Sequence, residues 1–224
     1  MKHILGEIGY IVLFGLLLFV PAGTLNWTRA WVLLVVLIGA RAVGTVRMLR
    51  ANRDLMDDRS KLPLRRGQPL ADKVLLLAFM ASFAGLVAFD AFERFHVTAF
   101  DEPGIVVAVG GLVVFVLGWW VVFAALWTNA FATTTVRYQP EREHRVVDAG
   151  VYGWVRHPMY AGMIAVMVGM GLWLGSYAGA MLAAVPGSIL AARIRVEERV
   201  LRASVAGYTT YAARVRSRLI PGVW

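Results

Sequence analysis

The sequence predicts an all-α protein, a multi-pass integral membrane bundle of about six helices. Of its 224 residues, 59% are hydrophobic, and the mean hydropathy is +0.65, which is too apolar for a soluble domain of this size. Several apolar runs approach the roughly 20 residues that a helix needs to cross a bilayer. The charged residues lie mainly between these runs, as in loops that join membrane helices.

Six segments account for the apolar runs. The first ends at Pro21, because proline interrupts a helix. The second is entered through Trp27 and Trp31, whose indole rings favour the membrane interface. The expected spans are residues 4–20, 30–46, 74–92, 104–127, 159–174 and 178–192.

The last two segments are expected to form a short hairpin inside the bundle. Segments of this length cover only about 23 Å as helices, less than a hydrocarbon core of ~30 Å. Pro186 and Gly187 interrupt the sixth segment. Its helix is expected to continue beyond Glu198, because residues 189–204 contain neither glycine nor proline.

The charge distribution predicts the orientation. If six helices alternate, the N-terminus, the basic loop 47–73, the polar stretch 128–158 and the C-terminal tail share one side, and nearly all lysines and arginines lie there. Basic loops favour the cytoplasm, so both termini and any site between them are predicted to be cytoplasmic. Arginine outnumbers lysine 20 to 3, as in GC-rich bacteria, which predicts a bacterial inner membrane.

Several function classes are disfavoured. The net charge of +9 falls in the loops, where orientation explains it, so nucleic-acid binding is not expected. The chain has no cysteine, and its four histidines lack the paired spacing of a zinc helix, so no metal site is predicted. A Gly-x-Gly-x-x-Gly turn after a strand is also missing, so no Rossmann domain is expected.

Two polar clusters flank the predicted hairpin. The first is residues 150–162 and the second is residues 193–198. Charged groups at a membrane boundary require water, a partner or a ligand. Taken singly, each cluster has an ordinary explanation: an ion pair between Arg193 and Glu197 at a helix end, and a snorkelling Arg156 among interfacial aromatic residues.

Taken together, the order and spacing of these motifs resemble the isoprenylcysteine carboxyl methyltransferase family, within the superfamily that includes phospholipid methyltransferases. The resemblance covers residues 128–224. The residues that produce it are Val136-Arg137-Tyr138-Gln139, the run His144–Gly150, the run Arg156–Gly162, Arg193 with Glu197-Glu198, Gly207-Tyr208 with Tyr211, and Leu219-Ile220-Pro221.

The resemblance implies a membrane methyltransferase that uses S-adenosyl-L-methionine. Residues 1–127 would supply four membrane helices, and residues 128–224 would form the cofactor-binding and catalytic region. Arg193 and Glu197 would face the acceptor. The implied cofactor-binding residues are Gln139, His144, Val147, Gly150, Tyr152, Arg156, His157, Tyr160 and Glu198. Val151 departs from the family, in which proline often follows the glycine.

The implied acceptor is lipid-like or prenylated, with carboxyl O-methylation at the cytoplasmic face. A carboxylate is already a nucleophile, so the protein needs to supply orientation and a positioned cation.

Two alternative functions stay open. One is a reductase-like protein that uses NADPH on an isoprenoid or steroid, and the other is a non-enzymatic membrane protein. Glu7 and Arg41, inside the first two spans, are interpreted as structural.

Overall fold

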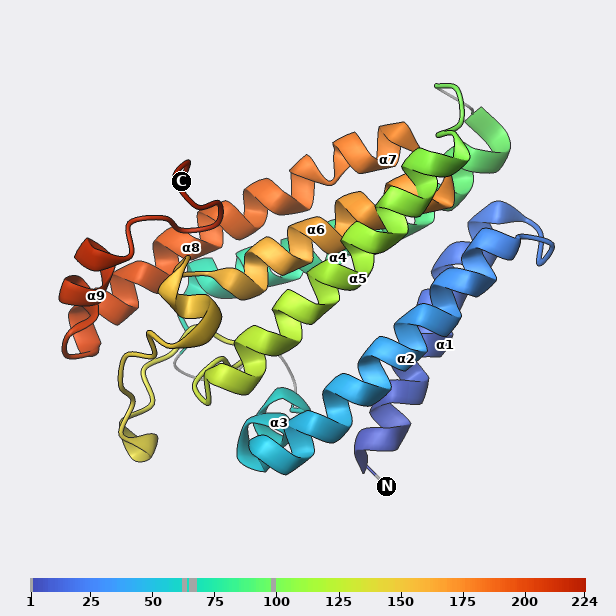
Figure 1. Cartoon of the computed structure of the whole chain (residues 1–224). Helices are drawn as coiled ribbons and strands as arrows, with labels where there is room; N and C mark the ends of the chain where they lie inside the picture. Colours follow the sequence, from blue (N-terminus) through green and yellow to red (C-terminus); the bar gives the residue numbers. More distant parts are fainter. Residues whose placement is uncertain (1, 62–63, 65–67, 98–99) are drawn as a thin grey trace.

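The computed structural model describes residues 2–61, 64, 68–97 and 100–224, and all regular elements within these residues are helical, which confirms the all-α prediction (Figure 1). Arg65 and Arg66 of the predicted basic loop lie outside the described residues. The helices are α1 (Lys2–Ala22), α2 (Thr28–Ala51), α3 (Arg53–Arg59), α4 (Leu70–Phe92), α5 (Ile105–Thr128), α6 (Pro158–Leu174), α7 (Tyr177–Leu182), α8 (Ala184–Ser204) and α9 (Tyr208–Arg214).

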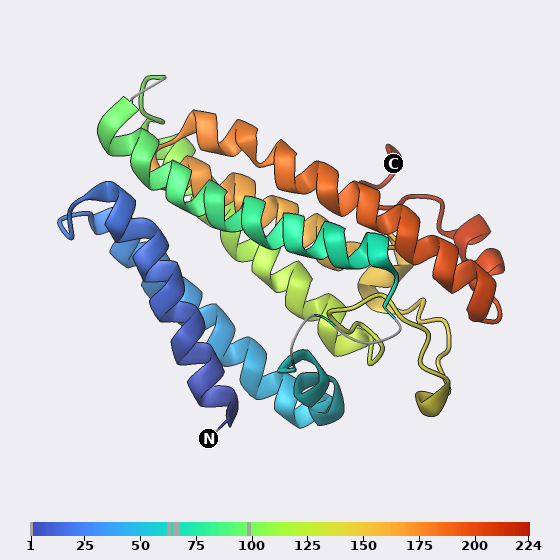
Figure 2. The same ribbon diagram turned by 180° about the vertical axis from the view of Figure 1, so that it is seen from behind.

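The chain crosses between two ends of the bundle. In the described part of the chain, five helical stretches are long and apolar enough to span a membrane, and α6 is a shorter apolar helix. The N-terminus, α3, residues 129–157 and α9 all lie at one end, which we call the loop-rich end (Figures 1 and 2). The tight connections between crossings lie at the other end. This arrangement confirms a multi-pass membrane bundle.

The short-hairpin prediction holds for α6 only. Its 17 residues span about 25 Å, whereas α7 and α8 together form a stretch of 28 residues from Tyr177 to Ser204. The break expected at Pro186-Gly187 lies earlier, at Ala183, between α7 and α8. Pro186 falls in the first turn of α8, where its missing N–H would have no partner in the helix.

The loop 47–73 contains a helix that was not predicted. Asn52 begins α3, and its side chain accepts a hydrogen bond from the Leu55 backbone N–H at 3.4 Å, which satisfies a donor at the start of the helix. Leu55 is fully buried against a cluster that includes Met48 and Val122. The burial of Leu55 therefore packs α3 against α2 and α5.

Helices α5 and α6 are in backbone contact along a seam of four glycines. A Cβ atom at Gly118 would lie 2.7 Å from the Gly162 carbonyl oxygen, and one at Gly169 would lie 2.5 Å from the Gly111 carbonyl oxygen. Only glycine permits this approach, which is typical of close helix pairs in membranes. The seam fixes the start of α6, where the first polar cluster lies.

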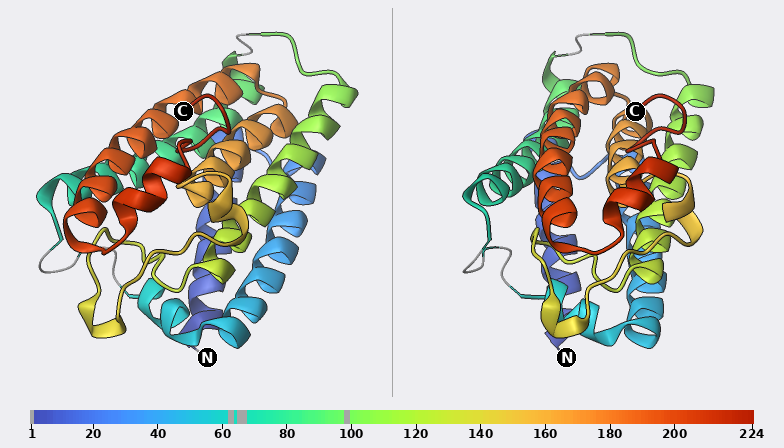
Figure 3. Two further views of the ribbon diagram at one scale, coloured as in Figure 1. Left: turned by 60° about the vertical axis from the view of Figure 1, so that its left-hand side comes forward. Right: turned by 90° about the vertical axis from the view of Figure 1, so that its left-hand side faces the viewer.

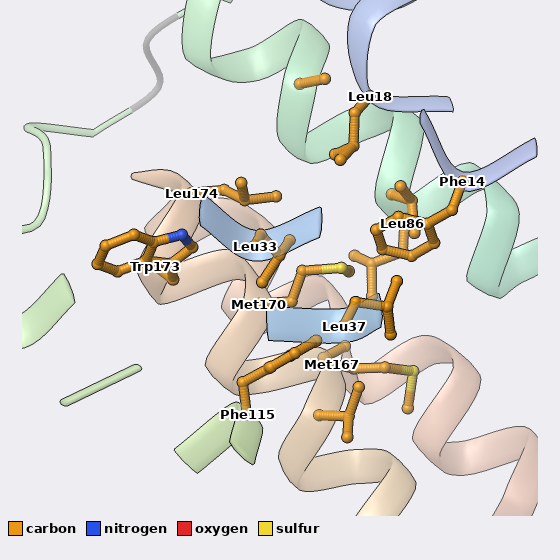
Figure 4. Close-up of a cluster of buried hydrophobic side chains, with 14 of the residues drawn as sticks. Phe14, Leu18, Leu33, Leu37, Leu86, Phe115, Met167, Met170, Trp173 and Leu174 are labelled. Atoms are coloured by element: carbon orange, nitrogen blue, oxygen red, sulfur yellow. The ribbon is translucent and has the colours of Figure 1, made fainter. Parts of the chain in front are cut away.

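Helix α6 is also the centre of the apolar core. Side chains of α1, α2, α4 and α5 converge on it (Figure 4). The fully or nearly fully buried members include Phe14, Leu18, Leu33, Leu37, Leu86, Phe115, Met167, Met170 and Leu174. The core therefore surrounds the helix that carries His157 and Tyr160 at its beginning.

Candidate active site at the loop-rich end

The two polar clusters meet where α6 begins and α8 approaches its end. Arg156 Nε donates to Glu198 Oε1 at 2.7 Å, and His157 Nε2 lies 3.4 Å from the same oxygen. The Tyr160 hydroxyl donates to Glu197 Oε2 at 2.8 Å. Residues some 40 positions apart are thus joined by charge-assisted hydrogen bonds, which are stronger than neutral ones.

Local geometry explains the position of His157. Pro158 begins α6, a position that suits proline, and His157 is the residue immediately before it. The backbone N–H groups of Arg156 and His157 donate to the carbonyls of Ser217 and Arg218 at 3.0 and 2.9 Å. The C-terminal tail therefore holds the turn in place (Figure 3).

The side chain of Arg156 is directed mainly to that tail. Its Nη1 donates to the carbonyls of Val215 and Arg216 at 2.6 and 2.8 Å, in addition to the bond from Nε to Glu198. Arg218 also lies 3.3 Å from Glu198 Oε2. Glu198 therefore joins the tail to the start of α6, and it does not line the cavity described next.

A polar cavity of about 90 Å³ lies beside these clusters. Eight residues from the sequence prediction line it: His144, Val147, Tyr152, Arg156, His157, Tyr160, Arg193 and Glu197. The other three, Gln139, Gly150 and Glu198, do not line it. Gln139 is fully buried, and its amide donates to the Phe131 carbonyl at 2.9 Å. Gly150 adopts φ +56 in the turn next to Thr128.

Four buried polar atoms of the cavity wall have no hydrogen-bond partner among the described residues. They are His144 Nδ1, Thr135 Oγ1, Arg137 Nε and the Tyr208 hydroxyl. Burial of a polar group without a partner costs free energy. Their gathering around one cavity therefore suits a ligand with several donors and acceptors.

Aromatic rings form another part of the wall. The His144 ring stacks on Phe131 with centroids 4.4 Å apart and planes at 24°. Burial, and then the positive charge of Arg142, lower the pKa of His144, so its ring is neutral at pH 7. Burial likewise raises the pKa of Tyr152 and Tyr208, so both hydroxyls keep their protons.

Arg193 is held by a residue that the sequence did not indicate. Its Nε donates to Asp72 Oδ1 at 2.7 Å, and its Nη2 donates to the Thr134 carbonyl. Asp72 is fully buried, and its other oxygen accepts from Gln68 and from the Val136 backbone N–H. Asp72 lies in the first turn of α4. An acidic residue is common at that position because it interacts favourably with the helix dipole, so the sequence offered no reason to assign Asp72 to a functional site.

A second, larger cavity of about 580 Å³ lies among α1, α2, α4, α5 and α6. Its wall is mainly apolar and includes five methionines, Met48, Met56, Met80, Met163 and Met167, besides Met159. Met159 lines both cavities. We call the two spaces the polar cavity and the membrane cavity. Near α1, the membrane cavity is bordered by the ion pair of Arg41 and Glu7, with Nε and Oε2 2.6 Å apart.

The comparison with known families bears on the same elements. No curated protein matches the chain. A family model described as phospholipid methyltransferase matches residues 106–205, which include α5, the loop that lines the polar cavity, and α6 to α8. Over residues 106–205, the chain is thus similar to the membrane methyltransferases of the phospholipid methyltransferase family, which includes enzymes like isoprenylcysteine carboxyl methyltransferase.

Proposed function

We propose that this protein transfers a methyl group from S-adenosyl-L-methionine to the carboxylate of a lipid-tailed acceptor at the cytoplasmic face of the membrane. The observation that supports this proposal most is the adjacency of the two cavities at Met159. A polar cofactor would enter from the loop-rich end, and the acceptor would enter from the membrane.

The residues of the polar cavity fit the chemistry of this cofactor. An adenosine offers ring nitrogens, an exocyclic amine and ribose hydroxyls, which suit the unpartnered atoms of His144, Thr135 and Tyr208. The Phe131 and His144 rings offer a flat apolar face for a base. Glu198 and Gln139 would act from outside the cavity, by holding Arg156 and the loop at 131–142 in position.

The loop that lines the polar cavity must part to admit the cofactor. The space of about 90 Å³ is smaller than the ~300–1,000 Å³ of typical small-molecule sites. Between Asn129 and Ala149 the chain contains only the short 3₁₀ turn Pro140–Arg142. We therefore expect the cofactor product S-adenosylhomocysteine to slow hydrogen exchange of the amides in residues 129–149.

The methyl transfer itself needs little from the protein beyond orientation and exclusion of water. S-adenosyl-L-methionine supplies a methyl group on a positively charged sulfur. Attack by an acceptor carboxylate forms an O–CH₃ bond while the S–CH₃ bond breaks, and the electron pair leaves with sulfur. No proton is transferred, so a general base is not required. Tyr160 fixes Glu197 beside the reacting centre.

The membrane cavity would bind the apolar tail of the acceptor while the acceptor stays in the bilayer. Flexible methionine side chains adapt to irregular ligands. A tail that moves from lipid into this cavity gains packing contacts and not hydrophobic free energy. A soluble enzyme would have to extract such an acceptor from the membrane. In this protein, only the head group of the acceptor would have to move, as far as Met159, where the two cavities meet.

Calorimetry on the detergent-solubilised protein tests the cofactor. We expect saturable heat with S-adenosylhomocysteine and none with NADPH. His144→Ala should weaken binding about tenfold, since it removes one hydrogen bond and one stacking face. His96→Ala is the matched control, because His96 lies at the opposite end of the bundle, beside Pro21. Binding of NADPH alone would overturn the proposal in favour of a reductase.

A further inference from the structure

Arg59, the last residue of α3, lies where the membrane cavity meets the polar cavity. Its Nη1 donates to the Ala132 carbonyl at 2.7 Å, and the same nitrogen lies 4.0 Å from Met159 Sδ. Since Met159 lines both cavities, the Arg59 guanidinium is at their junction. Helix α3 lies outside the residues that match the methyltransferase family.

Among the arginines that line the two cavities and are at least half-buried, Arg59 differs in its lack of a counter-charge within the described residues. Within the described residues, each of the other buried or half-buried arginines that line a cavity has a carboxylate partner, whereas Arg59 has no acidic partner. The partnered arginines are Arg41 with Glu7, Arg137 with Asp58 and Glu141, Arg156 with Glu198, and Arg193 with Asp72.

This absence has an electrostatic consequence. Burial lowers the pKa of Arg59, and the positive charge of nearby Arg193 lowers it further, yet a guanidinium keeps its proton at neutral pH. The Arg59 side chain is half-buried, and a cation that is partly removed from water without a counter-charge is destabilised. One carbonyl oxygen offsets only part of that cost, so an anion at this junction would be bound favourably.

Arg193, which the resemblance places with Glu197 toward the acceptor, already has partners for its charge. Asp72 already offsets the charge of Arg193, and the Thr134 carbonyl takes up its Nη2. Arg193 is therefore a fixed hydrogen-bond donor with little net charge to offer. Arg59 is the stronger candidate for pairing with an anion.

We propose that Arg59 binds the anionic head group of the acceptor and so selects lipids that carry a negative charge. This inference rests on the proposed function, because it concerns the acceptor of that reaction. The ligand class is a carboxylate at the end of an isoprenoid or acyl chain. The tail would occupy the membrane cavity, and the head would lie between Arg59 and the methyl donor.

The test compares Arg59→Gln with the wild type, using S-farnesylcysteine and its carboxamide as probes. Both are assayed as competitors of methyl transfer from labelled cofactor to a total membrane lipid extract. We expect the wild type to prefer the carboxylate over the amide, and Arg59→Gln to weaken carboxylate binding by about tenfold or more with little change for the amide. Arg59→Lys should restore part of the preference.

The control variant is Arg53→Gln, which removes an exposed arginine from the same short helix. S-adenosylhomocysteine affinity should be unchanged in all three variants, which would show that they fold.

A second arm of the experiment uses vesicles of phosphatidylethanolamine, whose phosphodiester is a different anion. Weakened binding of S-farnesylcysteine in Arg59→Gln supports the inference, whereas weakened binding of the phosphatidylethanolamine vesicles alone would contradict the carboxylate assignment. Equal binding of both anionic probes by Arg59→Gln and wild type would overturn it, whereas failure of the wild type to bind S-adenosylhomocysteine would overturn the proposed function instead.

Discussion

The polar cavity and the membrane cavity share Met159 but are built in opposite ways. The polar cavity is small, and two arginines of its wall are paired with carboxylates outside the cavity: Arg156 with Glu198, and Arg193 with Asp72. The membrane cavity is larger and apolar, with one unpaired cation at its inner end within the described residues. Fixed polar groups favour one precise ligand, whereas a flexible apolar wall accepts a class of tails. The contrast suggests one cofactor and a broader range of acceptors.

The largest expected effect comes from removing the charge of Arg156, which lines the polar cavity. In Arg156→Met, the Val215 and Arg216 carbonyls lose their donor, and Glu198 keeps only His157, Arg202 and Arg218 as partners. Loss of one member of a buried pair typically costs about 3–5 kcal/mol. We expect a clear drop in thermal stability and a loss of S-adenosylhomocysteine binding, measured by calorimetry and by a thermal-shift assay.

The control for that variant is Arg214→Met. Arg214 pairs with Asp148, but both side chains are exposed, and exposed pairs contribute about 0–1 kcal/mol. A similar loss of thermal stability and of S-adenosylhomocysteine binding in both variants would contradict a special role for the buried pair of Arg156 and Glu198.

A smaller effect is expected from filling the membrane cavity. In Ala84→Trp, an indole ring would enter that cavity from α4. The acceptor KM should rise about tenfold, or about 1.4 kcal/mol, because the ring would occupy space that the tail needs. The affinity for S-adenosylhomocysteine should not change. Ala81→Trp places the same ring on the exposed face of α4 and should change neither quantity. If Ala84→Trp weakened cofactor binding as much as acceptor binding, the two cavities would not be separate sites.

The smallest effect concerns pH and involves the polar cavity alone. The pKa of His144 is lowered from 6.5 in the folded protein, first by burial and then by Arg142. The unfolded chain therefore binds more protons, and stability is lost as pH falls from about 6.5 through the lowered pKa. The melting temperature should fall between about pH 7.5 and pH 5.5, and it should fall less in His144→Phe, which keeps the stacked ring. An equal fall in both proteins would contradict this assignment.

The sequence predicted the crossings well because each depends on local composition. Apolar runs suffice to locate a membrane helix. The cytoplasmic orientation inferred from the basic loops stays a prediction. The convergence of residues 150–162 and 193–198 also followed from sequence, since both clusters lie at the same end of consecutive helices. The continuation of the last helix beyond Glu198 was also predicted, and α8 ends at Ser204. The position of its break was wrong, because the interruption lies at Ala183 and not at Pro186-Gly187.

The partners of the site arginines could not be predicted in this way. Arg59 ends α3 and Asp72 lies in the first turn of α4. They reach the site through hydrogen bonds to Arg193 and to the loop at 129–137. Neither residue belongs to a recognisable motif. The direction of the Arg156 side chain was equally hidden, because its acceptors are backbone carbonyls of the tail. Pairings across long sequence separations require the three-dimensional structure.

The junction at Met159 can be tested directly because the chain contains no cysteine. In Met159→Cys, one thiol would report on both cavities, with a water-soluble maleimide as the label. We predict that S-adenosylhomocysteine and S-farnesylcysteine each slow labelling when added alone, since each would cover the same atom from a different side. Protection by only one of the two, at concentrations that saturate both, would contradict the account of two cavities that serve one reaction.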